Sequence, residues 1–337
     1  MNILLTCAGR RNYLIQYFKE ALGAEGFVCA ADASPDAPAL QEADRAFVVP
    51  PISDPGYFDL IFDICQKNQI RLLISLNDLE LPYLANNRSR FTDIGVLPVI
   101  SSPAVIDICF DKWRTVDFLT QNGIGAPKTY LLLKDALEAI SKRELSFPLV
   151  VKPRWGSASI GIEYPENLEE LELVYRLVRM HLKRSILASV SESNMEQAVL
   201  IQEKLIGQEY GLDVVNDLNG SYVNTYVKRK LAMRAGETDR ALTVQNNSLV
   251  AVGEKIGNTL KHIGNLDCDV FETENGAYVL EMNPRFGGGY PFTHAAGVNL
   301  PAALIAWVNG AEANPKWFQI KYNISAAKCD RVVLRKI

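Results

Sequence analysis

Two acids and an amide near the end of the sequence are spaced so that they could bind a metal ion. Glu281 and Asn283 are two residues apart in a strand pattern, so their side chains leave the strand on one face. Asp269 precedes them across a predicted hairpin turn at Asn275 and Gly276, and on the paired strand it can face the same way. Three hard oxygen ligands suit Mg²⁺, which usually keeps several waters and takes its remaining ligands from substrate phosphates.

Arg285 is the next residue on that face, where its guanidinium could meet a phosphoryl group in transfer. The alternative is an ordinary edge hairpin whose acids are solvated. Residues 277–280 are apolar, so the acids emerge from a buried strand, in which an unpaired carboxylate is costly. The pattern therefore favours a metal site with Asp269, Glu281 and Asn283 as its ligands.

A second candidate site follows the apolar strand predicted for residues 147–152. That strand ends in Lys152, whose buried ammonium group would need an anionic partner. Small residues dominate the next stretch, which includes Gly156, Ser157, Ala158, Ser159 and Gly161. Such a loop exposes backbone N–H groups that can close over phosphates. It lacks the Gly-Lys-Ser/Thr ending of a Walker A motif, so it is not a nucleotide-binding loop of that class.

The first hundred residues alternate short apolar runs with helical patterns, which is typical of a parallel α/β unit. Strands are predicted over 3–6, 28–31, 47–49, 72–76 and 96–100, and helices over 13–22 and 57–65. The first turn has one glycine, Gly9, where a dinucleotide fingerprint needs three. We therefore interpret Asp32, at the end of the second strand, as the start of a turn rather than as a ribose ligand.

Polar residues follow the fourth predicted strand, at the edge where a parallel sheet usually forms a crevice. Asn77, Asp78 and Glu80 are therefore candidates for binding an acceptor substrate. The alternative is that residues 75–78 cap the next helix, because Asn and Asp are strong cap residues.

The later part of the chain breaks at Gly123, Gly125 and Pro127, which mark a boundary. Helices are predicted over 111–121, 167–181, 248–262 and 299–308, and strands over 199–203 and 222–231. The stretch 203–213 is interpreted as a connector between two lobes, and 183–194 as a mobile surface segment. No internal repeat is visible, so a solenoid or a duplicated synthetase is excluded.

Composition indicates a globular enzyme. A chain of 337 residues that is 48% hydrophobic can form two or three compact units. The net charge of −4, with no basic block longer than the run 228–230, excludes a nucleic-acid footprint. The start lacks a signal-peptide pattern, and no apolar run is long enough to span a membrane. Six scattered cysteines without CxxC spacing are expected to be reduced thiols, so we expect a cytoplasmic protein.

Taken in order, these motifs resemble those of the ATP-grasp superfamily, and most closely the large subunit of carbamoyl-phosphate synthase and its stand-alone relatives. The ordered set is Lys112, Lys152 with its loop, Glu203, Glu209, Asp269 and residues 281–285. The resemblance covers nearly the whole chain and implies an α/β fold. A Rossmann-like pre-ATP-grasp domain (1–100) would precede a two-lobed α+β ATP-grasp unit, with the linker and first lobe at 101–204 and the second lobe at 205–337. It is also compatible with a homodimer.

The resemblance implies ATP and Mg²⁺, or Mn²⁺, as cofactors. Lys112 and Lys152 would contact the ATP phosphates, under a lid formed by Gly156, Ser157, Ser159 and Gly161. Glu203 and Leu205 would offer backbone groups to the adenine edge, and Lys204 could cover the adenine or a phosphate. Glu209 would hold the ribose hydroxyls. Lys228 and Arg285 would be the catalytic residues, with Lys228 chosen over Arg229 as the base that reaches the phosphates or the acyl intermediate.

The acceptor side departs from the family pattern. Residues 234–239 occupy the loop where relatives carry a Gly, Thr, Gly, Asp, Ser segment, which leaves the acceptor open. Arg234 and Glu237 in this loop are candidates to bind it. Tyr290 and His294, beyond the glycines at 287–289, are candidates to touch the substrate as well, although a lone histidine in such a segment is more often a satisfied structural group.

Three functions fit this set of residues. The favoured one is an ATP-dependent carboxylate–amine ligase that forms a C–N bond through an acyl phosphate and releases ADP and phosphate, with small-molecule substrates and neither nucleic acid nor membrane as a partner. The second is phosphorylation of bicarbonate, as in carbamoyl-phosphate synthase, although the chain has a single ATP-grasp unit. The third is a sensor that binds ATP without turnover, which would have no reason to keep Asp269, Glu281, Asn283 and Arg285 together.

Overall fold

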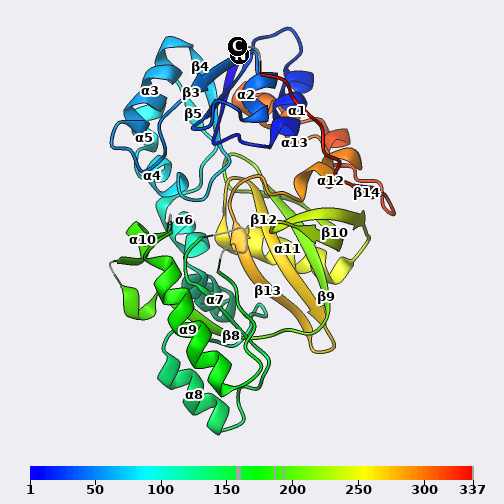
Figure 1. Ribbon diagram of the computed structural model, residues 1–337. Helices are drawn as coiled ribbons and strands as arrows, with labels where there is room; N and C mark the ends of the chain where they lie inside the picture. The colour runs from blue at the N-terminus through cyan, green and yellow to red at the C-terminus, as the bar shows by residue number, and fades with distance from the viewer. Residues whose placement is uncertain (157–160, 186, 193, 336–337) are drawn as a thin grey trace.

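The computed structural model describes residues 1–156, 161–185, 187–192 and 194–335, which form three sheets with their helices. In Figure 1 the blue and cyan N-terminal sheet lies at the top and the green small sheet at the bottom. The largest sheet lies between them, to the right. No helix in the described ranges is long and apolar enough to cross a membrane.

The N-terminal sheet has five parallel strands in the order β3-β2-β1-β4-β5, which confirms the predicted parallel α/β unit. Its strands are β1 (Asn2–Thr6), β2 (Val28–Asp32), β3 (Arg45–Val48), β4 (Ile70–Ser75) and β5 (Leu97–Pro98). Its helices are α1 (Asn12–Leu22), α2 (Pro38–Glu42), α3 (Tyr57–Lys67), α4 (Leu81–Asn86) and α5 (Arg88–Thr92). The direction of winding reverses between β1 and β4, so a crevice is expected at their carboxyl ends.

The small sheet is antiparallel, with the order β6-β8-β7. It contains β6 (Thr129–Tyr130), β7 (Leu149–Pro153) and β8 (Val199–Glu203), with α8 (Leu133–Ser141) and α9 (Leu168–Leu182) beside it. Helices α6 (Pro103–Phe110) and α7 (Lys112–Gln121) lead into this unit from the N-terminal sheet. The segment interpreted as a mobile stretch contains α10 (Ala188–Glu192) and the 3-10 turn η1 (Met195–Gln197) among its described residues.

The largest sheet has six antiparallel strands in the order β13-β12-β9-β10-β11-β14. They are β9 (Gln208–Asn216), β10 (Tyr222–Arg234), β11 (Glu237–Thr243), β12 (Gly264–Thr273), β13 (Gly276–Asn283) and β14 (Ser325–Ala327), and α11 (Asn247–Leu260) packs on the sheet. The interpretation of 203–213 as a connector holds only for residues 204–207, which join β8 to β9, because from residue 208 the chain forms β9 in the middle of this sheet, between β12 and β10. Its last seven residues are buried, which only pairing on both sides makes possible.

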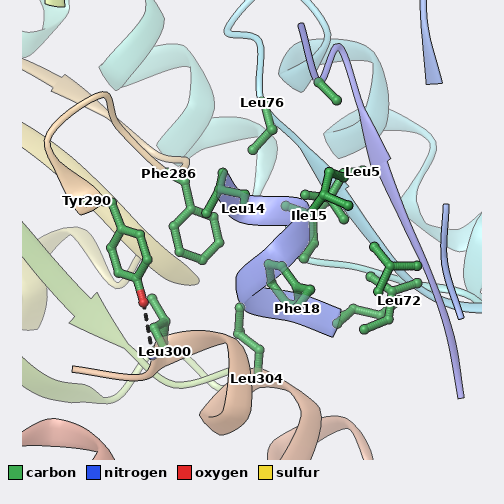
Figure 2. Close-up of a cluster of buried hydrophobic side chains, with 14 of the residues drawn as sticks. Leu5, Leu14, Ile15, Phe18, Leu72, Leu76, Phe286, Tyr290, Leu300 and Leu304 are labelled. Atoms are coloured by element: carbon green, nitrogen blue, oxygen red, sulfur yellow. Dashed lines mark hydrogen bonds between the residues drawn. The ribbon is translucent and has the colours of Figure 1, made fainter. Parts of the chain in front are cut away.

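The N-terminal unit and the end of the chain share one hydrophobic core. Helices α12 (Tyr290–Ala295) and α13 (Leu300–Val308), with the turn η2 (Pro315–Phe318), return to pack beside α1. Figure 2 shows the result, with Phe286 and Tyr290 next to Leu14 and Phe18. The hydroxyl of Tyr290 accepts a hydrogen bond from the backbone N–H of Leu300 at 3.1 Å. The proposed metal-bearing strand β13 is therefore anchored to the first sheet through the segment that follows it.

Candidate active site

The predicted metal ligands lie on one face of the hairpin formed by β12 and β13. Asp269 is directly opposite Glu281, which confirms the expected pairing of their strands. Asp267 is opposite Asn283 and adds a further carboxylate that the sequence analysis missed. Its signal was its position two residues before Asp269 on the same strand. The amide of Asn283 donates a hydrogen bond to Glu281 Oε1 at 3.2 Å.

Cationic side chains from two other segments face these acids. Lys230 Nζ, on β10, donates to Asp269 Oδ1 at 2.6 Å and to Glu209 Oε1 at 2.7 Å. Arg285 donates to Asp267 Oδ2 at 3.2 Å and to Asp78 Oδ2 at 2.9 Å. Arg285 therefore joins the hairpin to the crevice edge of the N-terminal sheet, where Asp78 was predicted to act.

The structure does not bring Lys228 to this pocket. Its Nζ donates to Asp213 and, at 3.0 Å, to Thr293 Oγ1, and the residue is 1% exposed. Gly289 covers it closely, since a Cβ there would lie 3.1 Å from Lys228 Cε. Lys230, and not Lys228, lines the pocket together with Asp269, Glu281 and Arg285, which makes Lys230 the better candidate for the predicted role. Both lysines leave one face of β10, so spacing alone could not distinguish the covered position from the open one.

Lys112 and Lys152 approach the same acids from the other side. They are 8% and 6% exposed, and Lys112 Nζ donates to the carbonyl oxygen of Gly156. Lys112, Gly156, Glu281 and Asn283 enclose a narrow space together with Asp78. Burial, followed by the positive charge of Lys112, lowers the pKa of Lys152 to about 8. Two cations held this close indicate a site for an anion of high charge, such as a polyphosphate.

The acids respond to these cations in opposite ways. Burial raises the pKa of Asp269 to about 7 despite Lys230, because Asp267 and Glu281 add like charge. Burial also acts on Glu281, but Lys112 and Lys152 outweigh it and lower the pKa of its carboxyl. Glu281 is therefore held in its charged form at neutral pH, whereas Asp269 is not held so firmly.

The oxygen atoms at this site fit Mg²⁺ if phosphate oxygens supply its remaining ligands. Asp269, Glu281 and Asn283 supply oxygen ligands of the kind that Mg²⁺ binds. Within the described residues, no three histidine, cysteine, aspartate or glutamate side chains converge closely enough to hold a metal ion unaided.

The loop 156–161 is described only at its ends, so the predicted roles of Ser157 and Ser159 concern residues outside the described ranges. Gly156 and Gly161 have φ angles of +95° and +67°, which favour glycine. A Cβ on Gly156 would also lie 2.8 Å from Leu187 Cδ1. These two glycines are thus required where the chain leaves β7 and Lys152.

The residues assigned to adenine and ribose lie along the end of β8 and the start of β9. Glu203 exchanges hydrogen bonds with Lys128, its N–H donating to the Lys128 carbonyl at 3.0 Å. Lys204 is exposed, with Nζ 5.2 Å from the ring centre of Tyr164, and Leu205 is half-buried. Glu209 binds Lys230. Their roles toward adenine and ribose remain predictions.

The three residues after β4 have different environments. Asp78 lies at the site, where its carboxylate forms an ion pair with Arg285. Asn77 Oδ1 accepts a hydrogen bond from the N–H of Leu79 at 3.0 Å, so it stabilises a turn and does not cap α4 directly. Glu80 is 0% exposed and accepts hydrogen bonds from Thr6, Ser75 and Tyr57 at 2.5 to 2.9 Å. The prediction of Glu80 as a substrate ligand is corrected, because this carboxyl is enclosed in the sheet edge.

Tyr290 and His294 belong to the shared core rather than to the pocket. Tyr290 is 0% exposed, and the His294 ring stacks on Tyr17 with 3.6 Å between ring centres. Burial lowers the pKa of His294 to about 4, so the ring is neutral at physiological pH. Their prediction as substrate ligands is corrected to a packing role, because helix α12 turns them toward α1.

Of the two candidates in the loop 234–239, Glu237 lies at the pocket and Arg234 does not. Arg234 binds Asp239 at 2.8 Å and Asp330 at 2.7 Å, and it does not line the pocket. Glu237 does line it and binds Lys328 at 3.0 Å. Arg11, which the sequence analysis missed, lies 3.6 Å from Glu237 and donates to the carbonyls of Leu76 and Phe286 at 2.7 and 3.2 Å. The first turn of the chain thus reaches the pocket.

Gly287 is expected to be intolerant of any side chain. A Cβ at this position would lie 2.0 Å from Asp267 Cγ, directly against a partner of Arg285. We expect Gly287→Ala to lower the free energy of unfolding by about 1–3 kcal/mol, measured by chemical denaturation. Gly56→Ala is the control, because its Cβ would only approach Asp54 Oδ1 at 3.3 Å. Equal stability of the two variants would contradict this expectation.

Nucleotide binding is expected to depend on pH through Lys152. Its pKa of about 8 lies below the usual lysine range, so above pH 8 the free protein holds the neutral amine. Bound phosphates favour the ammonium form, so ATP binding should take up a proton and weaken as pH rises above about 8. Calorimetry in buffers of different ionisation enthalpy measures this uptake. It should vanish in Lys152→Met and persist in Lys255→Met, which changes an exposed lysine on α11.

Family models match two parts of the chain. The model described as the PylC-like N-terminal domain matches residues 3–100. A second, described as ATP-grasp in the biosynthetic pathway with Ter operon, matches residues 195–330 and so includes all the proposed metal ligands.

Relatives and solved structures agree with these matches. The carbamoyl phosphate synthase large chain of Clostridium botulinum is 25% identical over 216 residues, which are 60% of this chain but 19% of that protein. The biotin carboxylase domain of Hydrogenobacter thermophilus 2-oxoglutarate carboxylase, solved with MgADP and bicarbonate, matches with a TM-score of 0.75 at 16% identity. The match covers 96% of this chain and 73% of that one. The L-amino acid ligase of Bacillus licheniformis matches with a TM-score of 0.68 at 18% identity, over 91% and 74% of the two chains.

Proposed function

Since the chain has the ATP-grasp fold behind a PylC-like N-terminal domain, we propose that it is an ATP-dependent carboxylate–amine ligase that forms a C–N bond. One observation supports this function above the others. Glu281 and Asn283 on β13 line one narrow space together with the buried Lys112, and the buried Lys152 is near enough for its charge to lower the pKa of Glu281. A site with acids for a metal on one side and cations for phosphates on the other is what phosphoryl transfer needs.

Different residues of the site bind the phosphates, the transferring phosphoryl group and the metal ion. Lys112 and Lys152 hold the ATP phosphates, and Arg285 stabilises the phosphoryl group in transfer. Asp269, Glu281 and Asn283 would hold Mg²⁺, or Mn²⁺, which would supply positive charge that offsets the charge of the phosphates. Lys230 replaces Lys228 as the cation that orients Asp269. None of these side chains needs to form a covalent bond with the substrate.

The reaction proceeds in two displacements. A carboxylate oxygen of the first substrate attacks the γ-phosphorus, the bond to the ADP oxygen breaks, and an acyl phosphate forms. The neutral nitrogen of the amine then attacks the acyl carbon, inorganic phosphate leaves, and the nitrogen loses its extra proton to phosphate or water. Positioning of the anions and neutralisation of their charge carry the catalysis.

Bicarbonate phosphorylation is the second candidate, because the similarity to the carbamoyl phosphate synthase large chain extends over 60% of this chain. In that reaction bicarbonate replaces the organic carboxylate as the nucleophile. The two candidates differ in the carboxylate that is phosphorylated, so an ADP assay with bicarbonate among the tested acids decides between them.

We also propose the finer features implied by the sequence. Domain boundaries lie near residues 100 and 204, with the second lobe joined to the N-terminal unit through the shared core. The free cysteines, four of them buried, suit a reducing compartment such as the cytoplasm. A homodimer is proposed from the family resemblance, and gel filtration with light scattering tests it.

The ligase function is tested by ADP and phosphate release from MgATP with a panel of carboxylates, including amino acids and bicarbonate. Hydroxylamine in the assay traps an acyl phosphate as a hydroxamate. We expect ADP release that depends on one organic carboxylate and a hydroxamate of that acid. ADP release with bicarbonate alone would favour the second candidate, and release of AMP instead of ADP would overturn both.

A further inference from the structure

A second, much larger cavity lies between the N-terminal sheet and the small sheet. Its volume is about 1030 Å³, and Asp269, Glu281 and Asn283 do not line it. The described lining comes from the carboxyl edge of the first sheet, the loop 49–53, helices α3, α4, α6, α7 and α10, and the segments around residues 154 and 194. A cavity of this size can enclose most of a small organic molecule.

The cavity adjoins the proposed reaction centre. Phe110 lines both this cavity and the narrow space that contains Lys112 and Glu281. Asn77 and Leu79 line the cavity, while Asp78 between them lines the narrow space. A molecule bound in the cavity could therefore extend one end toward the phosphates while its body stays outside the metal site.

Aromatic rings form a large share of the wall: Tyr57, Phe58, Tyr83, Phe110 and Trp155. Phe58 and Tyr83 are stacked with 3.3 Å between ring centres and 15° between ring planes. The hydroxyl of Tyr57 donates to Glu80 Oε1 at 2.9 Å, which fixes its ring against Phe58. Rings of this kind bind flat apolar groups and attract cations to their faces.

The charged groups of the lining give it a net negative charge. They are three carboxylates and two guanidinium groups, and the two guanidinium groups are already paired. Arg154 donates to Asp111 at 2.7 and 2.6 Å, and Arg114 binds Asp107. The third carboxylate, Asp32, accepts hydrogen bonds from the backbone N–H groups of Gly9 and Ser34 at 2.8 and 2.9 Å and has no cationic partner among the described residues that line the cavity. Such a lining attracts a cation and repels a second anion.

We propose that this cavity binds the amine substrate, and that this amine carries an aromatic or bulky apolar body. Asp32 and the ring faces attract the protonated amine, and its apolar part packs against the wall of the cavity. The ammonium group loses one proton to water, and its neutral nitrogen then attacks the acyl phosphate formed beside Lys112. The reaction of this amine rests on the proposed ligase function. Its binding preference is argued from the cavity alone.

Calorimetric titration with two matched probes tests the preference without turnover. The probes are 2-phenylethylamine and 3-phenylpropionate, which share a ring and chain length but carry opposite charges. We expect the amine to bind and the acid to bind at least about tenfold more weakly. Tyr83→Ala should weaken amine binding about tenfold, whereas Tyr322→Ala, at a residue 45% exposed outside the cavity, should leave it unchanged.

A second variant keeps the test decisive if Tyr83→Ala unfolds. Ser53→Arg places a positive charge at an exposed position of the lining, and it should weaken amine binding while MgATP still binds. Equal or tighter binding of 3-phenylpropionate, no binding of either probe, or amine binding indifferent to both variants would each overturn the proposal. Failure of the ligase function has a different outcome, because the amine would still bind while no carboxylate caused ADP release.

Discussion

Replacing Glu281 by glutamine should lower turnover by at least about 100-fold, with a much smaller loss of nucleotide affinity. Glutamine keeps the shape and can still accept the hydrogen bond from Asn283, but it removes the charge that faces Lys112 and Lys152. In a ligase, the metal that this carboxylate holds matters most as charge develops on the transferring phosphoryl group. Steady-state turnover and ATP dissociation constants measure the two effects separately.

Glu254→Gln is the matched control for this substitution. Glu254 is exposed on α11 and lies outside the pocket lined by Glu281, so the same chemical change should leave turnover unchanged. Normal turnover in Glu281→Gln would remove Glu281 from the metal site. Equal losses of turnover and of ATP affinity would instead favour a protein that binds the nucleotide without using it.

Lys228→Met should lower the free energy of unfolding by about 3–5 kcal/mol. The substitution leaves Asp213, which is 0% exposed, without the ammonium group that balances its charge. Thr293 and Asn265 still donate to this carboxylate, but neutral donors do not replace the lost charge. Chemical denaturation followed by circular dichroism measures the loss.

Lys230→Met is the matched variant, two residues further along the same strand. Its partners Glu209 and Asp269 have side chains 27% and 25% exposed, against 0% for Asp213, so the stability loss should be smaller. Turnover should fall about 10–100-fold, because Lys230 orients a proposed metal ligand. A loss of activity without a loss of stability in Lys228→Met would show that Lys228 acts in the reaction after all.

The sequence predicted those parts of the site that local chemistry determines. The alternation at Glu281 and Asn283, with a turn at Asn275 and Gly276, was sufficient to pair β12 with β13 and to bring Asp269 opposite Glu281. Lys152 at the end of an apolar strand likewise indicated a buried cation. Period-2 patterns and turn residues carry this information within a short segment.

The remaining features depend on contacts between distant segments. Whether Lys228 or Lys230 reaches the pocket is decided by α12 and Gly289, which cover only the first. Tyr290 looked available beside a glycine turn, yet the return of α12 onto α1 places it in the core. Strand β9 was missed because its glycine and charged residues suggest a loop, while its partners on both sides come from elsewhere in the chain.

The transfer of oxygen from the carboxylate to phosphate tests the central claim most directly. The carboxylate identified in the ADP assay is labelled with ¹⁸O on both oxygens, and the released phosphate is analysed by mass spectrometry after reaction with the amine. An acyl phosphate retains the attacking oxygen on phosphorus when the amine displaces phosphate, so we expect one ¹⁸O atom per phosphate. Phosphate without label, formed at the same rate as ADP, would mean that water attacks the γ-phosphorus and would contradict the ligase mechanism.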